Sequence, residues 1–311
     1  MARFAIADAL RPAIARVPKG SSLLYRAMLG QSGCSYRGDA YFRGHLRQRH
    51  RVFFDRFVGA FIAVDLADWA CRNHYFRGQY YEQEIPLLID TWLGDRGVFI
   101  DVGANRGIHS LYAATRLAGR GRVVAFEPNP ETLRILEAHL AINHIRNCEV
   151  HNAGLSDTNS TLTLNVVDEH HSGTCSFLPA EGAHRGHEVP VRRLDDLIAM
   201  PEVSEPVLVK IDTEGHEYHA IKGMERLLDH PKLVLVCEVT DDWLRRAGAS
   251  AAAVFDLMSK HGYSAFLPNA QFRGIFAGYR NRRLRLTPLD SPLADGRFQY
   301  DVVFARSDFT A

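Results

Sequence analysis

Within residues 98–107, a strand-forming run lies directly before a turn that contains two glycines. Residues 98–100 are apolar and favour a buried strand, and residues 108–117 continue with apolar side chains at helical spacing. Gly103 and Gly107 permit backbone angles and close approaches that a side chain forbids. A helix after such a turn points its unpaired N–H groups at whatever lies over the turn. The segment therefore predicts a strand, a ligand-binding turn and a helix.

This turn differs from the G-x-G-x-x-G sequence of dinucleotide-binding domains. Asn105 takes the place of the second glycine and Ile108 that of the third, so we expect neither close approach of a pyrophosphate nor glycine-mediated packing of the helix. A second predicted strand, residues 122–126, leads into Glu127, where an acid can accept hydrogen bonds from both hydroxyls of a ribose. The turn and the acid together favour a nucleoside ligand without a pyrophosphate.

Four further strings follow Asp101 and the glycine turn: FEPNP at 126–130, GLSD at 154–157, LDDL at 194–197 and VKIDTEG at 209–215. In this order and spacing they resemble the FkbM-like family of class I S-adenosylmethionine-dependent methyltransferases, over residues 80–305. The resemblance implies S-adenosyl-L-methionine as the cofactor. It also implies a Rossmann-like α/β fold, with a doubly wound, mostly parallel sheet of seven strands whose last strand is antiparallel.

The cofactor-binding residues predicted on this basis are Asp101, Gly103, Asn105, Gly107, Glu127, Ser156 and Asp157. Asp101 is expected to receive the cationic amino group, the glycine turn to lie along the amino-acid moiety, and Glu127 to bind the ribose. The resemblance implies that Ser156 and Asp157 contact the adenine amine. The alternatives are structural: a turn-capping role for Asp101, a turn without a ligand, and a local turn at Asp157.

Three candidate catalytic residues follow the predicted strand at 207–211, at the edge where open α/β sheets place their sites. They are Asp212, Glu214 and His216. His216 has the residue type of a general base, with an ordinary pKa of about 6.5, although it is one of fifteen histidines and lies at a variable position of the family pattern. The two acids match that pattern, so they carry more weight, either orienting the substrate or capping the next helix.

Metal sites are also conceivable in this sequence. Asp212 and Glu238 end neighbouring predicted strands, and two carboxylates at one edge suit Mg²⁺. No third ligand is evident, so we predict no metal. The four histidines between residues 168 and 188 match no compact zinc pattern and are read as part of a polar loop.

The pattern of segments predicts two domains, an N-terminal helical extension over residues 1–80 and a methyltransferase domain over residues 81–311. A small β insertion is expected, in which residues 161–166 pair with residues 188–191. Residues 1–60 hold eleven Lys/Arg and three Asp/Glu, against 26 and 33 in the remainder. This basic segment suits an anionic partner, or a solvated helical face on an acidic core.

The cysteine pattern and the N-terminus favour a cytoplasmic protein. The five cysteines form no C-x-x-C pair, an acid interrupts the first apolar stretch, and no apolar segment near the start is long enough to span a membrane. The function that the resemblance to the FkbM-like family implies is O-methylation of a hydroxyl on a sugar, glycan or other small molecule, and we expect no nucleic acid as partner. An NAD(P)-dependent oxidoreductase and a non-catalytic binding module that retains the fold are the alternatives.

Overall fold

The computed structural model describes residues 50–77, 80, 82–166, 175–179, 185–272, 282–294, 296 and 298–306. The chain divides into two compact units, Met1–Gln83 with Ala270–Arg283, and Glu84–Asn269 with Leu284–Ala311. All predicted site residues belong to the second unit. Residues 1–49, which make up most of the predicted extension, lie outside the described residues, as do three of the four histidines near the insertion.

The first unit contains a β-hairpin where we expected a helix. Strand β1 (His50–Asp55) pairs antiparallel with β2 (Ala60–Asp65), and helix α4 (Trp69–Arg77) follows. The helical prediction is wrong for residues 50–65. Along β2, Ile62 is buried and Phe61 is exposed, and this alternation with a period of two residues belongs to a strand that covers a core on one face.

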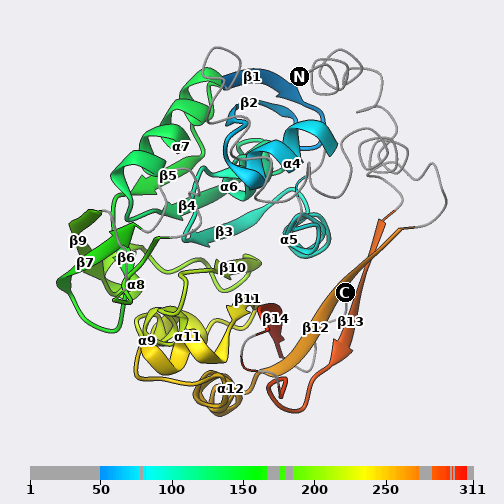
Figure 1. Ribbon diagram of the computed structural model, residues 1–311. Coiled ribbons are helices and arrows are strands. Elements are labelled where there is room, and N and C mark those ends of the chain that lie inside the picture. Colours follow the sequence, from blue (N-terminus) through cyan, green and yellow to red (C-terminus); the bar gives the residue numbers. More distant parts are fainter. Residues whose placement is uncertain are drawn as a thin grey trace. The chain divides into compact units, whose positions relative to one another are not determined.

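The second unit is built on one large sheet (Figure 1). Its strands are β3 (Gly97–Val102), β4 (Gly121–Phe126), β5 (Cys148–His151), β10 (Val207–Ile211), β11 (Leu233–Val239), β12 (Ser264–Phe272), β13 (Arg282–Pro288) and β14 (Tyr300–Ala305). The order across the sheet is β13-β12-β14-β11-β10-β3-β4-β5. Strands β5, β4, β3, β10 and β11 run parallel, and β14 is antiparallel to β11 and β12. The predicted doubly wound, mostly parallel sheet is confirmed, and β13 extends it by an eighth strand.

Helices precede the first strand of this sheet and follow the parallel strands. They are α5 (Glu84–Leu88), the π-helix η2 (Ile89–Leu93), α6 (Ile108–Leu117), α7 (Pro130–Ile142), α8 (Leu194–Leu197), α9 (Glu217–Lys222), α10 (Glu225–Leu228), α11 (Asp241–Arg246) and α12 (Ala251–Lys260). Helix α7 has a regular N-terminus, because the Asn129 side chain accepts a hydrogen bond from the backbone N–H of Glu131 at 3.0 Å and Pro130 occupies the first turn. In the described part of the chain, no helix combines the length and apolar character needed to cross a bilayer.

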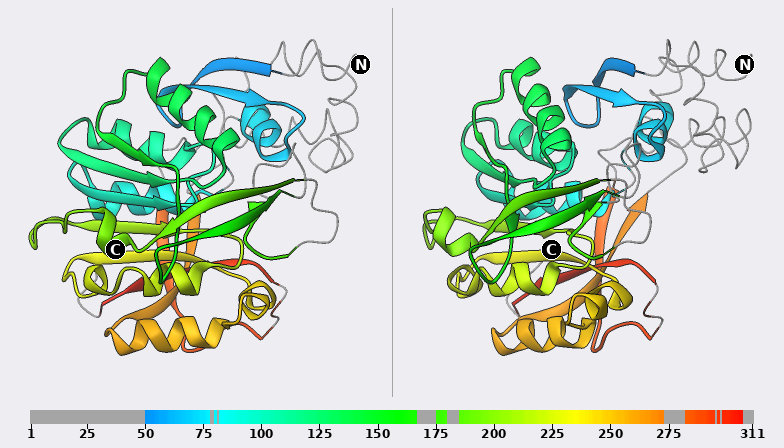
Figure 2. Two further views of the ribbon diagram at one scale, coloured as in Figure 1. Left: turned by 90° about the vertical axis from the view of Figure 1, so that its left-hand side faces the viewer. Right: turned by 60° about the vertical axis from the view of Figure 1, so that its left-hand side comes forward.

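The predicted β insertion is present as a four-stranded sheet in the order β6-β9-β7-β8. It consists of β6 (Gly154–Leu155), β7 (Ser160–Val166), β8 (Cys175–Ser176) and β9 (Arg185–Arg192). Strands β7 and β9 pair antiparallel along their length and form the ribbon drawn in green in Figure 2. The predicted pairing is therefore confirmed, and β6 and β8 add a short strand at each edge.

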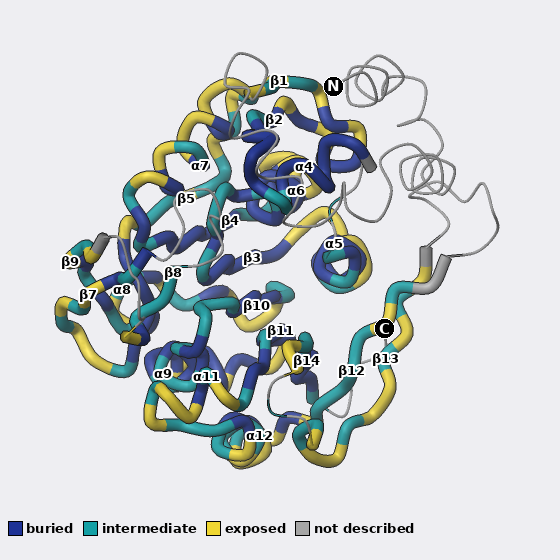
Figure 3. Tube along the Cα trace, in the orientation of Figure 1, coloured by how far each residue is buried: buried dark blue, intermediate teal, exposed yellow. Residues whose placement is uncertain are grey.

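The centre of the large sheet is fully buried, as Figure 3 shows for β3. Every residue of β3 and β10 is buried, as expected for parallel strands covered on both faces. From β3 the chain moves outward through β4 and β5 on one side, and on the other side β10 leads to β11. The order thus reverses between β3 and β10, and in open α/β sheets ligands bind beyond the carboxyl ends of the strands at such a point.

Candidate functional site

The turns after β3 and β10 are joined at this reversal point. The backbone N–H of Asp212 donates to the carbonyl of Val102 at 3.1 Å. Gly103, with a φ of +77°, faces the same turn, and a Cβ at this position would lie 1.9 Å from the Asp212 carbonyl oxygen. Only a residue without a side chain permits this approach. The predicted cofactor turn and the predicted catalytic segment are therefore direct neighbours.

Asp101 lies in β3 with its carboxylate buried beneath the turn; the residue is 1% exposed. One oxygen, Oδ2, accepts a hydrogen bond from the Ser110 hydroxyl of α6 at 2.5 Å. The other oxygen, Oδ1, is buried and has no hydrogen-bond partner within the described residues. A buried carboxylate oxygen without a donor is costly, so this atom has the properties of a ligand-binding group.

Glu127 is bound to the backbone of the glycine turn. Its Oε2 accepts a hydrogen bond from the N–H of Asn105 at 2.7 Å, and its Oε1 accepts one from the N–H of Asn129 at 2.8 Å. Asn105 adopts a φ of +51°, in the left-handed region that asparagine tolerates better than most residues. Burial raises the pKa of Glu127 to about 7, the charges of Asp101 and Asp212 add to this, and the two N–H donors oppose it.

Gly107 has a packing role that the sequence pattern did not predict. It precedes α6 with a φ of +77°, and a Cβ there would lie 2.7 Å from Cγ of Leu136 in α7. The expectation that no glycine mediates helix packing in this turn is therefore wrong. Gly107 supplies that close approach one position before the third glycine of the dinucleotide pattern, and so brings α6 and α7 together under the site.

Ser156 and Asp157 follow β6, and their side chains contact helix α9. The Asp157 carboxylate accepts hydrogen bonds from Lys222 Nζ at 2.9 Å and lies 3.4 Å from Nδ1 of His219. Burial alone would raise the pKa of Asp157, but the contacts with Lys222 and His219 outweigh it and lower the pKa to about 2. These contacts favour the structural alternative for Asp157 over the adenine contact.

The residue that directly follows β5 is Asn152, which is not among the predicted site residues. Its side-chain amide donates to the carbonyls of Glu127 at 3.0 Å and Pro128 at 3.1 Å. The turn after β5 is thereby tied to the turn after β4. The signal for Asn152 is its place directly after β5, because site residues of this fold class lie at the carboxyl ends of the strands.

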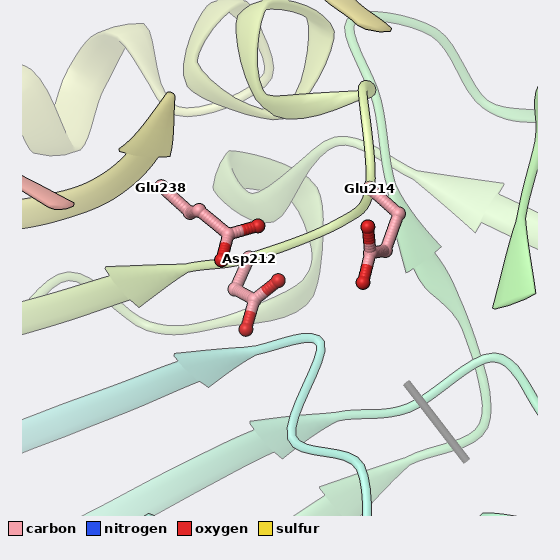
Figure 4. Close-up of side chains that lie close together, drawn as sticks. All are labelled: Asp212, Glu214 and Glu238. Atoms are coloured by element: carbon pink, nitrogen blue, oxygen red, sulfur yellow. The ribbon is translucent and has the colours of Figure 1, made fainter. Parts of the chain in front are cut away.

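Three carboxylates converge beyond β10 and β11 (Figure 4). Oxygen atoms of Asp212, Glu214 and Glu238 lie within 4.8 Å of one another. The structure thus brings Glu214 to the pair that the sequence predicted, and three such oxygens form a set that Mg²⁺ or Ca²⁺ accepts. Lys210 Nζ already lies 2.9 Å from Asp212, so part of the negative charge is balanced within the chain.

The surroundings of Glu238 disfavour the ionised form of its carboxyl group. Burial raises its pKa well above the ordinary value, and the charges of Asp212 and Glu214 raise it further. Gln299 Nε2 donates to Glu238 Oε1. A carboxyl group in this environment holds a proton to higher pH than usual, which makes it a stronger proton acceptor once ionised.

His216 is part of a different set of contacts. Its Nε2 lies 3.0 Å from the Ser156 hydroxyl, and its ring stacks on His219 with centroids 4.8 Å apart. Burial and the neighbouring His219 lower its pKa to about 4. An imidazole with this pKa is neutral at pH 7 but a weak base. The geometry therefore places more weight on Asp212 and Glu214 than on His216, as the sequence did.

The predicted residues thus fall into two groups. The first group lies around the turns after β3, β4 and β10 and consists of Asp101, Gly103, Asn105, Gly107, Glu127, Asp212 and Glu214. The second group shares contacts with α9 and consists of Ser156, Asp157 and His216. In the first group, carboxylate side chains surround a backbone turn with positive φ angles. Such a set can bind a cationic ligand that carries hydroxyl groups and can accept a proton beside it.

Comparisons with known proteins agree with this geometry. The methyltransferase FkbM domain matches residues 101–265, just over half of the chain. Two curated relatives are 30% identical: AMB antimetabolite synthetase AmbE of Pseudomonas aeruginosa, over 61% of this chain and 10% of the relative, and hexuronic acid methyltransferase AglP of Haloferax volcanii, over 50% of this chain and 61% of the relative. The matches thus span less than two thirds of either relative's own length.

Among solved structures, precorrin-6y C5,15-methyltransferase from Geobacter metallireducens aligns with a TM-score of 0.39 at 14% identity, covering 74% of this chain and 89% of that one. A SAM-dependent O-methyltransferase from Thermotoga maritima aligns with a TM-score of 0.38 at 11% identity, covering 75% and 68%. The family assignment rests on the domain match, which begins at Asp101 and includes Glu127, Asp212 and Glu238. The chain belongs to the FkbM methyltransferase family.

Proposed function

We propose that this protein is an S-adenosyl-L-methionine-dependent O-methyltransferase that acts on a hydroxyl of a sugar or another small molecule. The observation that carries the proposal is the juxtaposition of two features at one sheet edge. Asp101 and Glu127 flank a glycine turn of the type that suits a nucleoside, and the approach of Gly103 to Asp212 sets the acidic cluster beside that turn.

The side chains fit the proposed cofactor at both ends. Oδ1 of Asp101, buried and unpartnered within the described residues, is a suitable acceptor for a cationic amino group. Each oxygen of Glu127 accepts one backbone N–H and retains a lone pair, so the carboxylate can also accept two ribose hydroxyls. When bound, the cofactor supplies a methyl group on a cationic sulfur atom.

The acidic cluster is the proposed binding site of the methyl acceptor. Methyl transfer to oxygen needs an oriented hydroxyl that loses its proton, and most of the acceleration comes from holding that oxygen in line with the methyl group. Asp212 and Glu214 are the proposed catalytic residues, which bind the hydroxyl and accept the proton. Lys210 Nζ lies 2.9 Å from Oδ2 of Asp212, and this contact orients the Asp212 carboxylate within the cluster.

One relative supports a sugar as the acceptor, because this 30% identical protein is named a hexuronic acid methyltransferase. Three other relatives are a synthetase and two methyltransferases whose names state no acceptor. A carbohydrate or a hydroxylated metabolite is therefore the acceptor class to test first.

The test is direct. Calorimetry with S-adenosyl-L-methionine, NAD⁺ and NADP⁺ should show binding of the first and not of the nicotinamide cofactors, since Asn105 replaces the glycine that a pyrophosphate needs. Transfer of an isotopically labelled methyl group to a panel of uronic acids, neutral sugars and small hydroxylated metabolites should then identify the acceptor. Binding of NAD(P)⁺ alone would support the oxidoreductase alternative, and donor binding without turnover would support the binding module.

A further inference from the structure

The segment that carries Asp212 and Glu214 has an unfavourable backbone conformation. Glu214 adopts a φ of +56° and Gly215 a φ of +107°. A residue with a side chain rarely occupies the left-handed region, because its Cβ crowds the following carbonyl. Glu214 therefore needs neighbouring contacts to hold it in place, and those contacts determine where its carboxylate lies.

Glu217, in the first turn of α9, supplies these contacts from one atom. Its Oε1 accepts hydrogen bonds from the backbone N–H of Thr213 at 3.0 Å, from the N–H of Gly215 at 2.9 Å and from the Thr213 hydroxyl at 3.1 Å. The two N–H groups lie on either side of Glu214. One carboxylate oxygen thus fixes the backbone both before and after the strained residue.

The burial of Glu217 makes this arrangement hard to replace. The residue is 2% exposed, so loss of its carboxylate would leave the buried N–H of Gly215 and the partly buried N–H of Thr213 without this acceptor. The Ser176 hydroxyl donates to the Glu214 carbonyl at 2.6 Å and supports the same turn from the insertion. That bond restrains the carbonyl but leaves the two flanking N–H groups dependent on Glu217.

We infer that Glu217 is a positioning residue for the proposed acceptor site: it holds the turn at residues 212–215 so that the Glu214 carboxylate meets Asp212 and Glu238. The inference rests on the proposed function for its kinetic consequence. Glu217 itself is buried under the turn, and it acts through Glu214. Its effect should therefore appear in steps that involve the acceptor and leave donor binding at the Asp101 and Glu127 end unchanged.

Three variants test the inference. Glu217→Ala removes the acceptor oxygen, Glu217→Gln keeps an oxygen where Oε1 lies, and Glu217→Asp shortens the side chain by one methylene. Amide hydrogen exchange at Thr213 and Gly215 should accelerate at least about tenfold in the Ala variant and stay near the original rate in the Gln variant. With the identified acceptor, kcat/KM should fall at least about tenfold in the Ala variant and recover in the Gln variant, because small misplacements at a reacting centre are costly.

Asp195→Ala is the matched control. Asp195 is also buried, and its Oδ2 accepts a backbone N–H, that of Arg226, at 2.9 Å. This variant should lower stability in the same way while the exchange of Thr213 and Gly215, and the acceptor kinetics, stay unchanged. If Glu217→Ala does not fold, Glu217→Asp provides the same comparison with a smaller loss.

The exchange measurement separates this inference from the proposed function. Unchanged protection of Thr213 and Gly215 in folded Glu217→Ala or Glu217→Asp would overturn the positioning role, whatever the enzyme does. A donor affinity that falls as much as kcat/KM would overturn it as well, because the defect would then extend beyond the acceptor turn. If exchange is faster in the Glu217 variants but the unaltered protein transfers no methyl group, the proposed function is overturned. That result would still support the role of Glu217 in holding the turn.

Discussion

Gly103 and Asp212 approach each other so closely that a Cβ on Gly103 would lie 1.9 Å from the Asp212 carbonyl oxygen. This contact joins the turn after β3, where the donor is proposed to bind, to the turn after β10, which carries two of the proposed catalytic acids. The separation between donor and acceptor groups therefore depends on a backbone contact that a methyl group would disrupt.

Gly103→Ala should consequently disrupt both stability and turnover. The substitution places a methyl group against backbone that cannot move aside cheaply, so we expect a loss of roughly 2 kcal/mol or more in the free energy of unfolding. Gly119→Ala is the control, because Gly119 has the same φ of +77° and no atom of the described residues lies within 4 Å of its Cβ position. Urea unfolding of both variants isolates the contact; equal losses would contradict our interpretation.

Glu127→Ala should weaken donor binding by one to two orders of magnitude. The variant removes the proposed acceptor of the ribose hydroxyls, and charge-assisted hydrogen bonds of this kind contribute about 1.5–3 kcal/mol. Calorimetric titration with S-adenosyl-L-methionine measures the effect, with the exposed Glu137 of α7 changed to Ala as control. An unaltered affinity in Glu127→Ala would remove Glu127 from the proposed site.

Donor affinity should also depend on pH through Glu127. Its pKa of about 7 lies above the ordinary value of 4.5 because the carboxyl is buried, so the folded protein holds this proton up to near-neutral pH. Ribose hydroxyls donate best to the ionised form, and binding should therefore weaken as pH falls below 7, by nearly tenfold between pH 7.5 and pH 6. Glu127→Gln should lose this part of the pH dependence, and a profile shared by both proteins would count against it.

The raised pKa of Glu127 changes the stability of the fold with pH in the opposite direction to donor binding. Between pH 4.5 and pH 7 the folded state holds a proton on Glu127 that the unfolded chain has released. The contribution of this group to the free energy of unfolding therefore decreases as pH rises through that window, because ionisation stabilises the unfolded chain while the buried carboxyl in the fold stays protonated. Thermal unfolding of the ligand-free protein at pH 5 and pH 7.5, compared with Glu127→Gln, would reveal this decrease.

Asp157→Asn should affect the packing of α9 more than donor binding. The pKa of Asp157 lies near 2 because Lys222 and His219 contact its carboxylate, so its contribution is complete above pH 3.8 and is lost as pH falls toward 2. Because Lys222 is partly exposed, we expect at most about 1 kcal/mol of destabilisation at pH 7, and a donor affinity within about twofold. A tenfold loss of donor affinity would instead support the adenine contact.

The sequence predicted the elements whose signals are local. The apolar run at 98–100 and the paired segments at 161–166 and 188–191 correspond to β3, β7 and β9. The prediction failed where contacts between distant residues determine the structure. Residues 50–65 form the hairpin of β1 and β2 in place of the predicted helical extension.

The candidate site shows the same division. Asp101, Glu127 and Asp212 follow from their positions at the ends of predicted strands. The meeting of Glu214 with Asp212 and Glu238 depends on a left-handed backbone conformation, and no spacing rule predicts that for glutamate. Likewise, the hold of Glu217 on the turn is visible only once the side chains are placed.

Methyl transfer should persist after divalent metal ions are removed. Three clustered carboxylates would favour a cation if all were ionised, but Lys210 lies 2.9 Å from Asp212 and burial raises the pKa of Glu238 well above its ordinary value. A bound proton and an ammonium group therefore balance much of the charge within the chain itself. We expect turnover within about twofold of its original value after dialysis against EDTA, with metal content measured by elemental analysis. Loss of activity that Mg²⁺ or Mn²⁺ restores, together with weaker metal binding by Glu214→Gln, would instead show that the cluster holds a metal ion.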